Sequence, residues 1–463
     1  MTATSSEAKS RSVITPRGKI AYGSGVFLDQ IGLHAVGSLA NPIFNVALGV
    51  SPAALGIVMS VFRIWDAFTD PVVGNFSDNF RHPWGRRRPL IILGALLSGV
   101  FFAAIWWVPG GWSTSGILWY FAVLNLFYFT AHTIFSIPYQ ALAMELTPHY
   151  HERTRLMAVR SFISVIGWFG LSWVYPFAQL DIFGGVLTGI KVAGIAGGII
   201  FIFSGVVPAL FLKERLQTSA QQQEKITLTR AVSLTLSNRS FLALELVALL
   251  QVFGSNIVQT LLFYITTYCY FVGDPKAAAP YMGWYGTVGT LGMIVFIPLV
   301  PVISRRFDKK GALFIVLAIC VIASVAEWFL LQIGNPLLTL ITRFFYNGAN
   351  IAFWTLWPSM VADLCDEDQL RTGRRREGSF MAVGQWINKA GLTLAIVVSG
   401  FLLVWIGFDA ELEGRQSGGT LRWMQFCFSL LPAILGGISL LVLGGYRLTE
   451  KRMQEIQEAL AEH

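Results

Sequence analysis

Residues 85–109 have the sequence GRRRPLIILGALLSGVFFAAIWWVP, in which three arginines precede a continuous apolar run. The run is about as long as the roughly 20 residues that a helix needs to cross a bilayer. The rest of the chain has the same character, because 54% of its 463 residues are hydrophobic and only 13% are charged. Soluble chains carry roughly 25% charge. We therefore predict an all-α membrane protein whose outer surface faces lipid.

Twelve apolar spans are predicted, six on each side of a polar segment. The first six lie near 20–47, 52–77, 89–109, 116–145, 157–179 and 184–212, and the last six near 241–271, 281–303, 311–332, 335–362, 379–406 and 421–446. The predicted organisation is a tail at 1–19, a six-helix bundle at 20–212, a linker at 213–240, a second bundle at 241–446 and a tail at 447–463.

The basic residues are distributed unevenly over the predicted loops. The outer side of the predicted topology contains only Lys191, Lys276, Arg415 and Arg422, and loops rich in Lys and Arg stay on the cytoplasmic side. We therefore expect both termini in the cytoplasm, no cleavable signal peptide, and an inner (plasma) membrane location. The net charge of +8 follows from this topology. It does not indicate nucleic-acid binding, because the basic residues are spread over alternate loops.

The two halves of the chain repeat a short pattern at corresponding positions. Glu145-Leu146 is followed by Arg153-Thr154, and Asp363-Leu364 is followed by Arg371-Thr372 at the same spacing. Both pairs begin at the predicted inner end of the fourth span of a half. Parallel six-helix repeats around a central cavity are a known transporter architecture. The sequence thus predicts two pseudo-symmetric six-helix bundles, and charges of these inner loops, including Arg81, are candidates for ion pairs.

Ionisable residues at membrane depth are costly and mark functional candidates. The densest group is Arg63-Ile64-Trp65-Asp66-Ala67-Phe68-Thr69-Asp70-Pro71 in the second span. Asp66 and Asp70 lie four residues apart and so share one helical face. A cation or proton between them would relieve their repulsion, and Thr69 adds an oxygen ligand for Na⁺. The alternative is a structural carboxylate pair held by Arg63 or by another helix.

Other charged residues of the spans have less certain roles. Lys389 in the eleventh span needs an anionic partner, for which Asp66 or Asp70 are candidates, unless it extends to the interface. Asp29 in the first span is a candidate substrate contact or a helix–helix hydrogen bond. Arg160 faces either a cavity or the cytoplasmic surface. Glu245 and Glu327 are placed near span ends, and Arg343 is left unassigned.

The sequence contains no pattern typical of an enzyme. There is no phosphate-binding loop and no nucleophile–base constellation. The four scattered cysteines are interpreted as small buried side chains. His149, His151 and Glu152 do not make a convincing metal site, because no fourth ligand is evident. No cofactor and no metal beyond a coupling cation are expected.

Several motifs together carry a family resemblance. Arg63-Ile64-Trp65-Asp66-Ala67, Asp70-Pro71, Gly74 and Trp84-Gly85-Arg86 resemble the glycoside–pentoside–hexuronide:cation symporter family of the major facilitator superfamily. Supporting matches are Tyr22-Gly23, Gly25, Ile137-Pro138, Met360-Val361-Ala362-Asp363, Arg376-Glu377, Ser379, Lys389 and Gly391. The resemblance covers both halves and implies the major facilitator fold.

The resemblance also implies roles for individual residues. The cation-binding positions are Asp66, Thr69, Asp70 and Thr133, and the substrate-binding positions are Asp29, Gln30, Ser136, Gln140, Arg160 and Lys389. Members that transport melibiose have an Asp before the Ile-Pro pair of the fourth span and a Trp shortly after it. Here Ser136 and Gln140 occupy these positions. The residues of the cation site therefore match the family pattern more closely than the residues of the galactoside site do.

We expect secondary active transport, in which Na⁺ or H⁺ drives symport of a small polar solute such as a glycoside, sugar or sugar acid by alternating access. The expected partners are this solute and membrane lipids, and the expected state is a monomer. One alternative is transport of a lysolipid or another amphipathic solute on the same fold. A remote alternative is an intramembrane enzyme.

Overall fold

The computed structural model describes residues 14–146, 150–212, 238–372, 377–448 and 450–461. Within these ranges every regular element is a helix, which agrees with the all-α prediction. The chain divides into two compact units, residues 1–222 and 223–463. Most of the predicted tail at 1–19 and of the linker at 213–240 lies outside the described residues.

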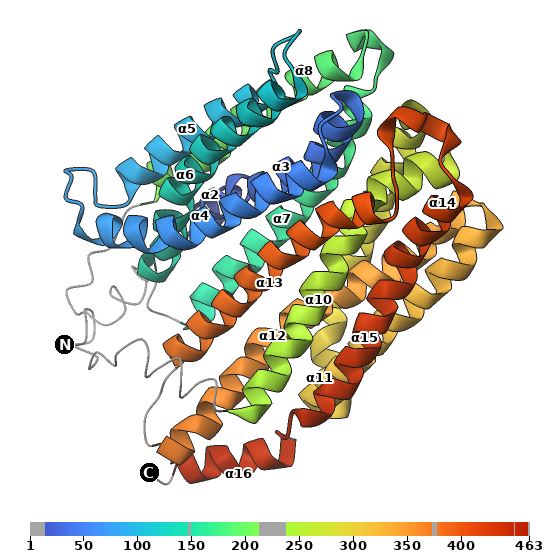
Figure 1. The fold of residues 1–463 in the computed structure, drawn as a ribbon. Coiled ribbons are helices and arrows are strands. Elements are labelled where there is room, and N and C mark those ends of the chain that lie inside the picture. Colours follow the sequence, from blue (N-terminus) through green and yellow to red (C-terminus); the bar gives the residue numbers. More distant parts are fainter. Residues whose placement is uncertain (1–13, 147–149, 213–237, 373–376, 449, 462–463) are drawn as a thin grey trace. The chain divides into compact units, whose positions relative to one another are not determined.

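The first unit contains a helical run followed by five long helices (Figure 1). The run comprises α2 (Pro16–Ser24), the π-helix η1 (Phe27–Gly32), α3 (Leu33–Ala40) and the π-helix η2 (Asn41–Ala47). The long helices are α4 (Pro52–Asn79), α5 (Arg88–Ile105), α6 (Thr114–Leu146), α7 (Tyr150–Ala178) and α8 (Val186–Phe211), with a short 3-10 turn η3 (Asp181–Phe183) before α8.

The second unit is also helical throughout its described residues. Its elements are α10 (Arg239–Tyr264), η4 (Ile265–Tyr270), α11 (Pro275–Ile333), α12 (Pro336–Thr372), α13 (Glu377–Trp405), η5 (Ala410–Arg415), α14 (Gly418–Gln425), η6 (Phe426–Leu430), α15 (Leu431–Val442), η7 (Leu443–Gly445) and α16 (Glu450–Ala461). The predicted tail at 447–463 thus contains a helix. Met453 and Ile456 of α16 are buried in the core of this unit, and α16 crosses its end in Figure 1.

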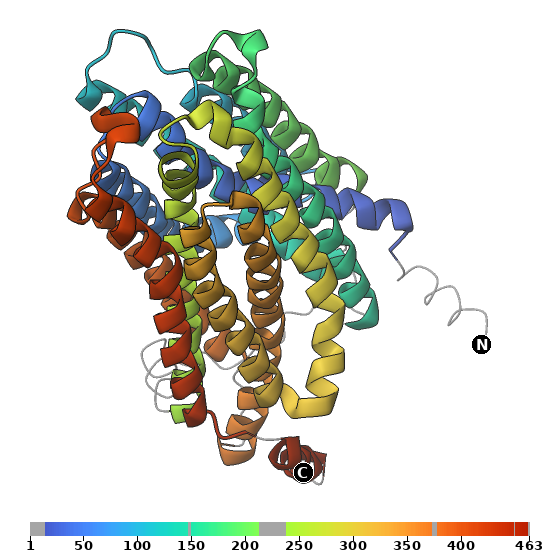
Figure 2. The same ribbon diagram turned by 90° about the vertical axis from the view of Figure 1, so that its right-hand side faces the viewer.

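Each of the twelve predicted spans coincides with helix. The spans at 281–303 and 311–332 are the two arms of α11, which are separated by Asp308 with φ 58° and ψ 177°. The Asp308 carboxylate accepts a hydrogen bond from the Gly311 backbone N–H at 2.6 Å and so caps the second arm. Figure 2 shows the chain reversing at the end of the yellow helix.

A test of helix length and apolar composition finds fewer than the twelve predicted spans. Among the described residues, nine helices are long and apolar enough to cross a membrane, and α11 counts once although it has two arms. The first predicted span, which contains Asp29, Gln30 and His34, is not among the nine. The more polar α12, which contains Arg343, Asn347 and Asn350, is also not among them.

Small residues bring the helices of the first unit close together. A Cβ atom added at Gly99 of α5 would lie 2.5 Å from the Gly198 carbonyl oxygen of α8. A Cβ at Gly94 of α5 would collide with the Phe135 backbone of α6. Close approach through glycine is typical of membrane helices, whose association depends on van der Waals packing. This packing fixes α6, which carries Thr133, Ser136 and Gln140 of the candidate site.

Candidate functional site

The first cluster surrounds Asp29, which is 4% exposed and lies in the π-helical turn η1. Its Oδ1 accepts hydrogen bonds from Ser136 Oγ at 2.5 Å and from Gln140 Nε2 at 3.1 Å, both on α6. Its Oδ2 forms an ion pair with Arg160 of α7. Single π-helical turns are frequent at functional sites. Four predicted substrate-binding residues therefore meet within one unit.

Aromatic side chains hold this cluster in place. The Tyr139 hydroxyl donates to the Tyr22 carbonyl at 2.8 Å, and the two rings stack with centroids 4.7 Å apart. The Arg160 guanidinium carbon lies 5.9 Å from the centroid of the Tyr139 ring. His132 Nε2 lies 3.1 Å from the Asp29 carbonyl oxygen. The Asp29–Arg160 pair is thus fixed from several sides.

The second cluster joins α4 to α6. Thr133 Oγ1 donates to Asp70 Oδ1 at 3.4 Å, and Thr69 Oγ1 lies 3.5 Å from Thr133 Oγ1. Carboxylate and hydroxyl oxygens are ligands suited to a hard cation. Asp66 is 9% exposed, and its Oδ2 lies 3.7 Å from an Arg63 nitrogen one turn away. Asp66 therefore also has the structural partner, Arg63, that the sequence left open, whereas Asp70 accepts a hydrogen bond from Thr133, which in turn contacts Thr69.

Helix α6 connects the two clusters. Thr133, Ser136 and Gln140 lie three and four residues apart, so they share one face of the helix. Thr133 contacts Asp70 in the second cluster, while Ser136 and Gln140 contact Asp29 in the first. One face of α6 therefore contacts both carboxylates.

Gln30 and Lys389 are the two other predicted substrate residues. Gln30 follows Asp29 in η1 and is half-buried. Lys389 lies in α13 of the second unit and is half-buried, and its carbonyl oxygen accepts a hydrogen bond from Thr393 Oγ1 at 2.9 Å. Its pairing with Asp66 or Asp70 would join the two units and stays a prediction.

The inner-loop charges pair differently from the repeated sequence pattern. Asp363 accepts from Lys309 Nζ at 2.6 and 2.7 Å, while Arg371 lies 3.7 Å from Asp368. Glu152 binds two cations, Lys19 at 2.9 Å and Arg155 at 3.1 Å. The side chains of Glu145, His149, His151 and Arg153 and the run Arg374–Arg376 lie outside the described residues.

Residues 21–450 match the family model described as MFS/sugar transport protein. The chain belongs to this family. It contains the glycoside–pentoside–hexuronide symporters, so the resemblance seen in the motifs is confirmed. The chain is a membrane transporter of the major facilitator fold rather than an enzyme.

Similar proteins support this assignment over the full length. The uncharacterized symporter sll1374 of Synechocystis sp. is 25% identical, with 96% of each chain covered. The putative glycoside/cation symporter YagG of Escherichia coli is 24% identical, with 97% of this chain and 96% of the relative covered. The fold resembles that of a bacterial homologue of the lysosomal transporter Spinster, with a TM-score of 0.67, 13% identity and coverage of 97% and 99%.

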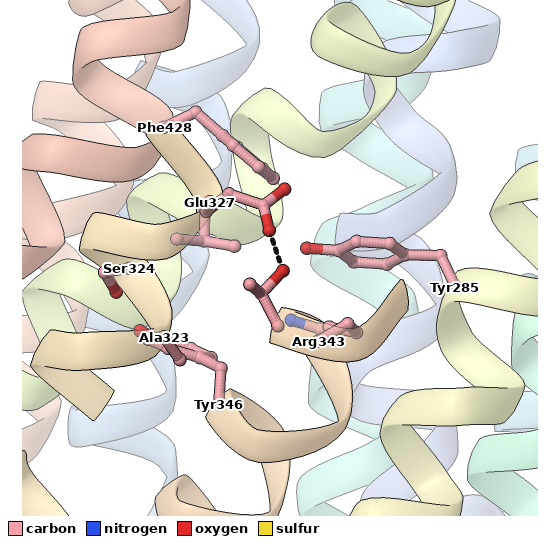
Figure 3. Close-up of a pocket in the computed structure, with 9 residues that line it drawn as sticks. Tyr285, Ala323, Ser324, Glu327, Arg343, Tyr346 and Phe428 are labelled. Carbon is pink, nitrogen blue, oxygen red and sulfur yellow. Dashed lines mark hydrogen bonds between the residues drawn. The ribbon is translucent and has the colours of Figure 1, made fainter. Parts of the chain in front are cut away.

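The transporter also has polar residues whose roles the sequence did not reveal. Trp65 Nε1 donates to Thr130 Oγ1 at 2.9 Å and joins α4 to α6 beside the second cluster. In the second unit, Glu327 lines a cavity of about 20 Å³ together with Arg343 and Tyr285 (Figure 3). The sequence analysis placed Glu327 near the end of a span. Its side chain is instead buried between α11 and α12, where Thr342 donates a hydrogen bond to it.

Proposed function

We propose that this transporter is a cation-coupled symporter of a small polar solute, such as a glycoside, sugar or sugar acid. The observation that carries the proposal is the position of Thr133 and Ser136, one turn apart on α6. Thr133 contacts the carboxylate proposed to bind the cation, and Ser136 contacts the carboxylate proposed to bind the solute. A rigid helix face shared by both sites provides the energetic coupling that symport requires.

The chemistry of each cluster defines a role for it. Asp70, Thr69 and Thr133 provide oxygen ligands for Na⁺, or a carboxylate that exchanges a proton, with Asp66 one turn away on the same face. Asp29 and Arg160 form a charged pair that offers acceptors and donors to solute hydroxyls through charge-assisted hydrogen bonds. Lys389, from the second unit, is proposed to complete the site by neighbouring the carboxylates.

We also propose that the protein lies in the inner membrane with both termini in the cytoplasm. The distribution of basic residues supports cytoplasmic termini and an inner-membrane location. Alternating access would then expose the two clusters first to one side of the membrane and then to the other. Lipids surround the protein, and a monomer is sufficient because both clusters are built within one unit.

The proposal is tested by thermal-shift screening of the purified protein against glycosides, sugar acids and lysolipids, with Na⁺ present or absent. A bound ligand raises the melting temperature, and the stabilisation grows with the logarithm of the ligand concentration divided by its Kd. Stabilisation by a glycoside or sugar acid that increases with Na⁺ or with proton concentration supports the proposal. Stabilisation by lysolipids alone would instead indicate an amphipathic substrate.

A further inference from the structure

Two buried glutamates of the second unit lie in contrasting surroundings. Glu327 accepts a hydrogen bond from Thr342 and lines a cavity with Arg343, whose guanidinium carbon lies 4.5 Å from the Tyr285 ring centroid (Figure 3). Glu245 of α10 is 1% exposed, and within the described residues neither of its carboxyl oxygens has a hydrogen-bond partner. Glu327 therefore has a hydroxyl donor and a nearby cation to stabilise a negative charge, whereas in the described residues Glu245 has only the neutral indole of Trp357 beside it.

The immediate neighbours of Glu245 are a glycine and an indole. A Cβ atom added at Gly384 of α13 would lie 2.8 Å from Glu245 Oε1 and 3.1 Å from Cζ2 of Trp357 in α12. The Trp357 indole N–H is itself buried without a hydrogen-bond partner in the part of the chain that is described. The carboxyl group is thus enclosed where three helices, α10, α12 and α13, approach one another.

No cation of the surrounding helices forms an ion pair with Glu245 in the described residues. On α10, Arg239 lies six residues before it, and on α13 Lys389 lies five residues beyond Gly384, which turns it to another face. On α12, Arg343 packs on Tyr285 and Asp363 binds Lys309. The segments α15, η4, η6 and η7, which also pack on α10, contain no Asp, Glu, Lys or Arg.

A buried carboxylate with no counter-ion, and with a neutral indole as its one neighbouring donor, takes up a proton rather than remaining charged. A metal cation would not satisfy this position, because Na⁺-like ions need several oxygen ligands and the neighbours here are a glycine and an indole. We propose that Glu245 carries a proton in this conformation and is a proton-binding site of the second unit, separate from the clusters around Asp29 and Asp70.

The site connects protonation to helix movement. The proton can leave only when water or a cation reaches the carboxyl group, and this requires Gly384 or Trp357 to move away from it. The proton affinity of Glu245 therefore changes when α12 or α13 shifts against α10. The site makes the conformational equilibrium of the transporter pH-dependent, whichever cation drives transport, and does not depend on the symport proposed above.

Infrared difference spectroscopy of the purified full-length protein tests the inference. The spectrum of Glu245→Gln minus wild type at neutral pH should show the loss of one protonated-carboxyl C=O band, which shifts in D₂O. Glu327→Gln is the matched control, and Asp70→Asn is a second control from the first unit; both should retain the band. Retention of the band in Glu245→Gln, or its loss only in Glu327→Gln, would overturn the inference.

A second variant covers the case in which Glu245→Gln does not fold. Trp357→Phe keeps an aromatic ring but removes the indole beside the carboxyl group, so the same band should remain and shift in frequency. In wild type the band should be present at neutral pH and should disappear as the pH is raised to about 8–9, where buried glutamates can titrate. A band unchanged by Trp357→Phe, or absent at every pH, contradicts the proposed site.

Discussion

Arg160 of α7 donates to the carboxylate of Asp29, which lies in the π-helical turn of the first span. The Asp29 side chain is 3% exposed and the Arg160 side chain 19%. Such a pair is more informative about function than about stability, since buried ion pairs contribute little net free energy compared with apolar residues. The pair instead keeps two opposite charges available at the centre of the first unit.

Removing the negative charge of this pair should be costly. Asp29→Asn leaves the Arg160 guanidinium without its counter-ion, so the free energy of unfolding should fall by about 3 kcal/mol, the lower end for broken buried pairs, since Arg160 is partly exposed. Solute binding should be lost as well.

Denaturant titration of the Asp29→Asn protein in detergent measures the free energy of unfolding. Gln140→Ala is the control, and the loss of its neutral hydrogen bond should cost about 1 kcal/mol. Equal effects of the two changes would argue against a charged role for Asp29.

The two hydroxyls of α6 should have separable effects. Thr133→Ala removes the group that donates to Asp70, so it should raise the cation concentration needed for half-maximal transport, and Thr133→Ser should restore it. Ser136→Ala removes a donor to Asp29, so it should raise the solute concentration needed. Initial uptake rates in proteoliposomes measure both. If Thr133→Ala changed only the solute dependence, the assignment of the clusters would be wrong.

The pair between Lys309 and Asp363 should join the arms of α11 to α12. Asp363→Lys alone places two cations together and should destabilise the protein, while the exchange Lys309→Asp with Asp363→Lys should recover part of the loss. The Lys309 side chain is 39% exposed, so the coupling energy should be about 1 kcal/mol, as for screened pairs. A double-mutant cycle on unfolding free energies gives this value. A coupling energy of zero would show that the pair does not stabilise the unit.

The acid stability of the protein should depend on Glu152. The hydrogen bond from Lys19 lowers the pKa of Glu152 below its ordinary value, helped by Arg155. The stabilisation is therefore present above the unfolded pKa of about 4.3 and is lost as the pH falls through the lower pKa of the folded protein. Glu152→Gln should make the melting temperature less dependent on pH between neutral and acidic pH.

Arg155→Ala is the control for this prediction, because Arg155 is 71% exposed and its removal should change the melting temperature little. An identical pH dependence in Glu152→Gln and wild type would contradict the role of Lys19.

The sequence predicted the helices well because apolar runs of span length have few alternative structures in a membrane. It separated the spans at 281–303 and 311–332, but it did not predict that Asp308 forms the reversal with a positive φ, since a single such residue leaves no periodic signal. Asp29 could be identified from its cost at membrane depth, and the family motifs added Ser136, Gln140 and Arg160. That these three side chains all bind Asp29 required the structure, since contacts between distant helices cannot be derived from spacing.

The burial of Glu245 and Glu327 also could not be predicted from the sequence. Distance from the end of a span placed Glu245 and Glu327 near the membrane boundary, where water would accommodate a charge. The structure buries both, because Thr342 and Arg343 of α12 approach Glu327 and Trp357 and Gly384 approach Glu245. Burial of a polar side chain depends on the neighbouring helices and not on its own position along the chain.

Concentrative uptake in proteoliposomes under an imposed Na⁺ or H⁺ gradient, with the solute found by thermal-shift screening, tests the coupled transport most directly. Asp70→Asn keeps the shape of the side chain but removes the charge that the coupling cation needs. We predict that it abolishes uphill accumulation, while solute binding weakens by at most about 1–3 kcal/mol of lost coupling energy. If both Asp70→Asn and Asp66→Asn accumulate the solute as wild type does, with the same cation dependence, the second-span carboxylates are structural and the proposed coupling site is wrong.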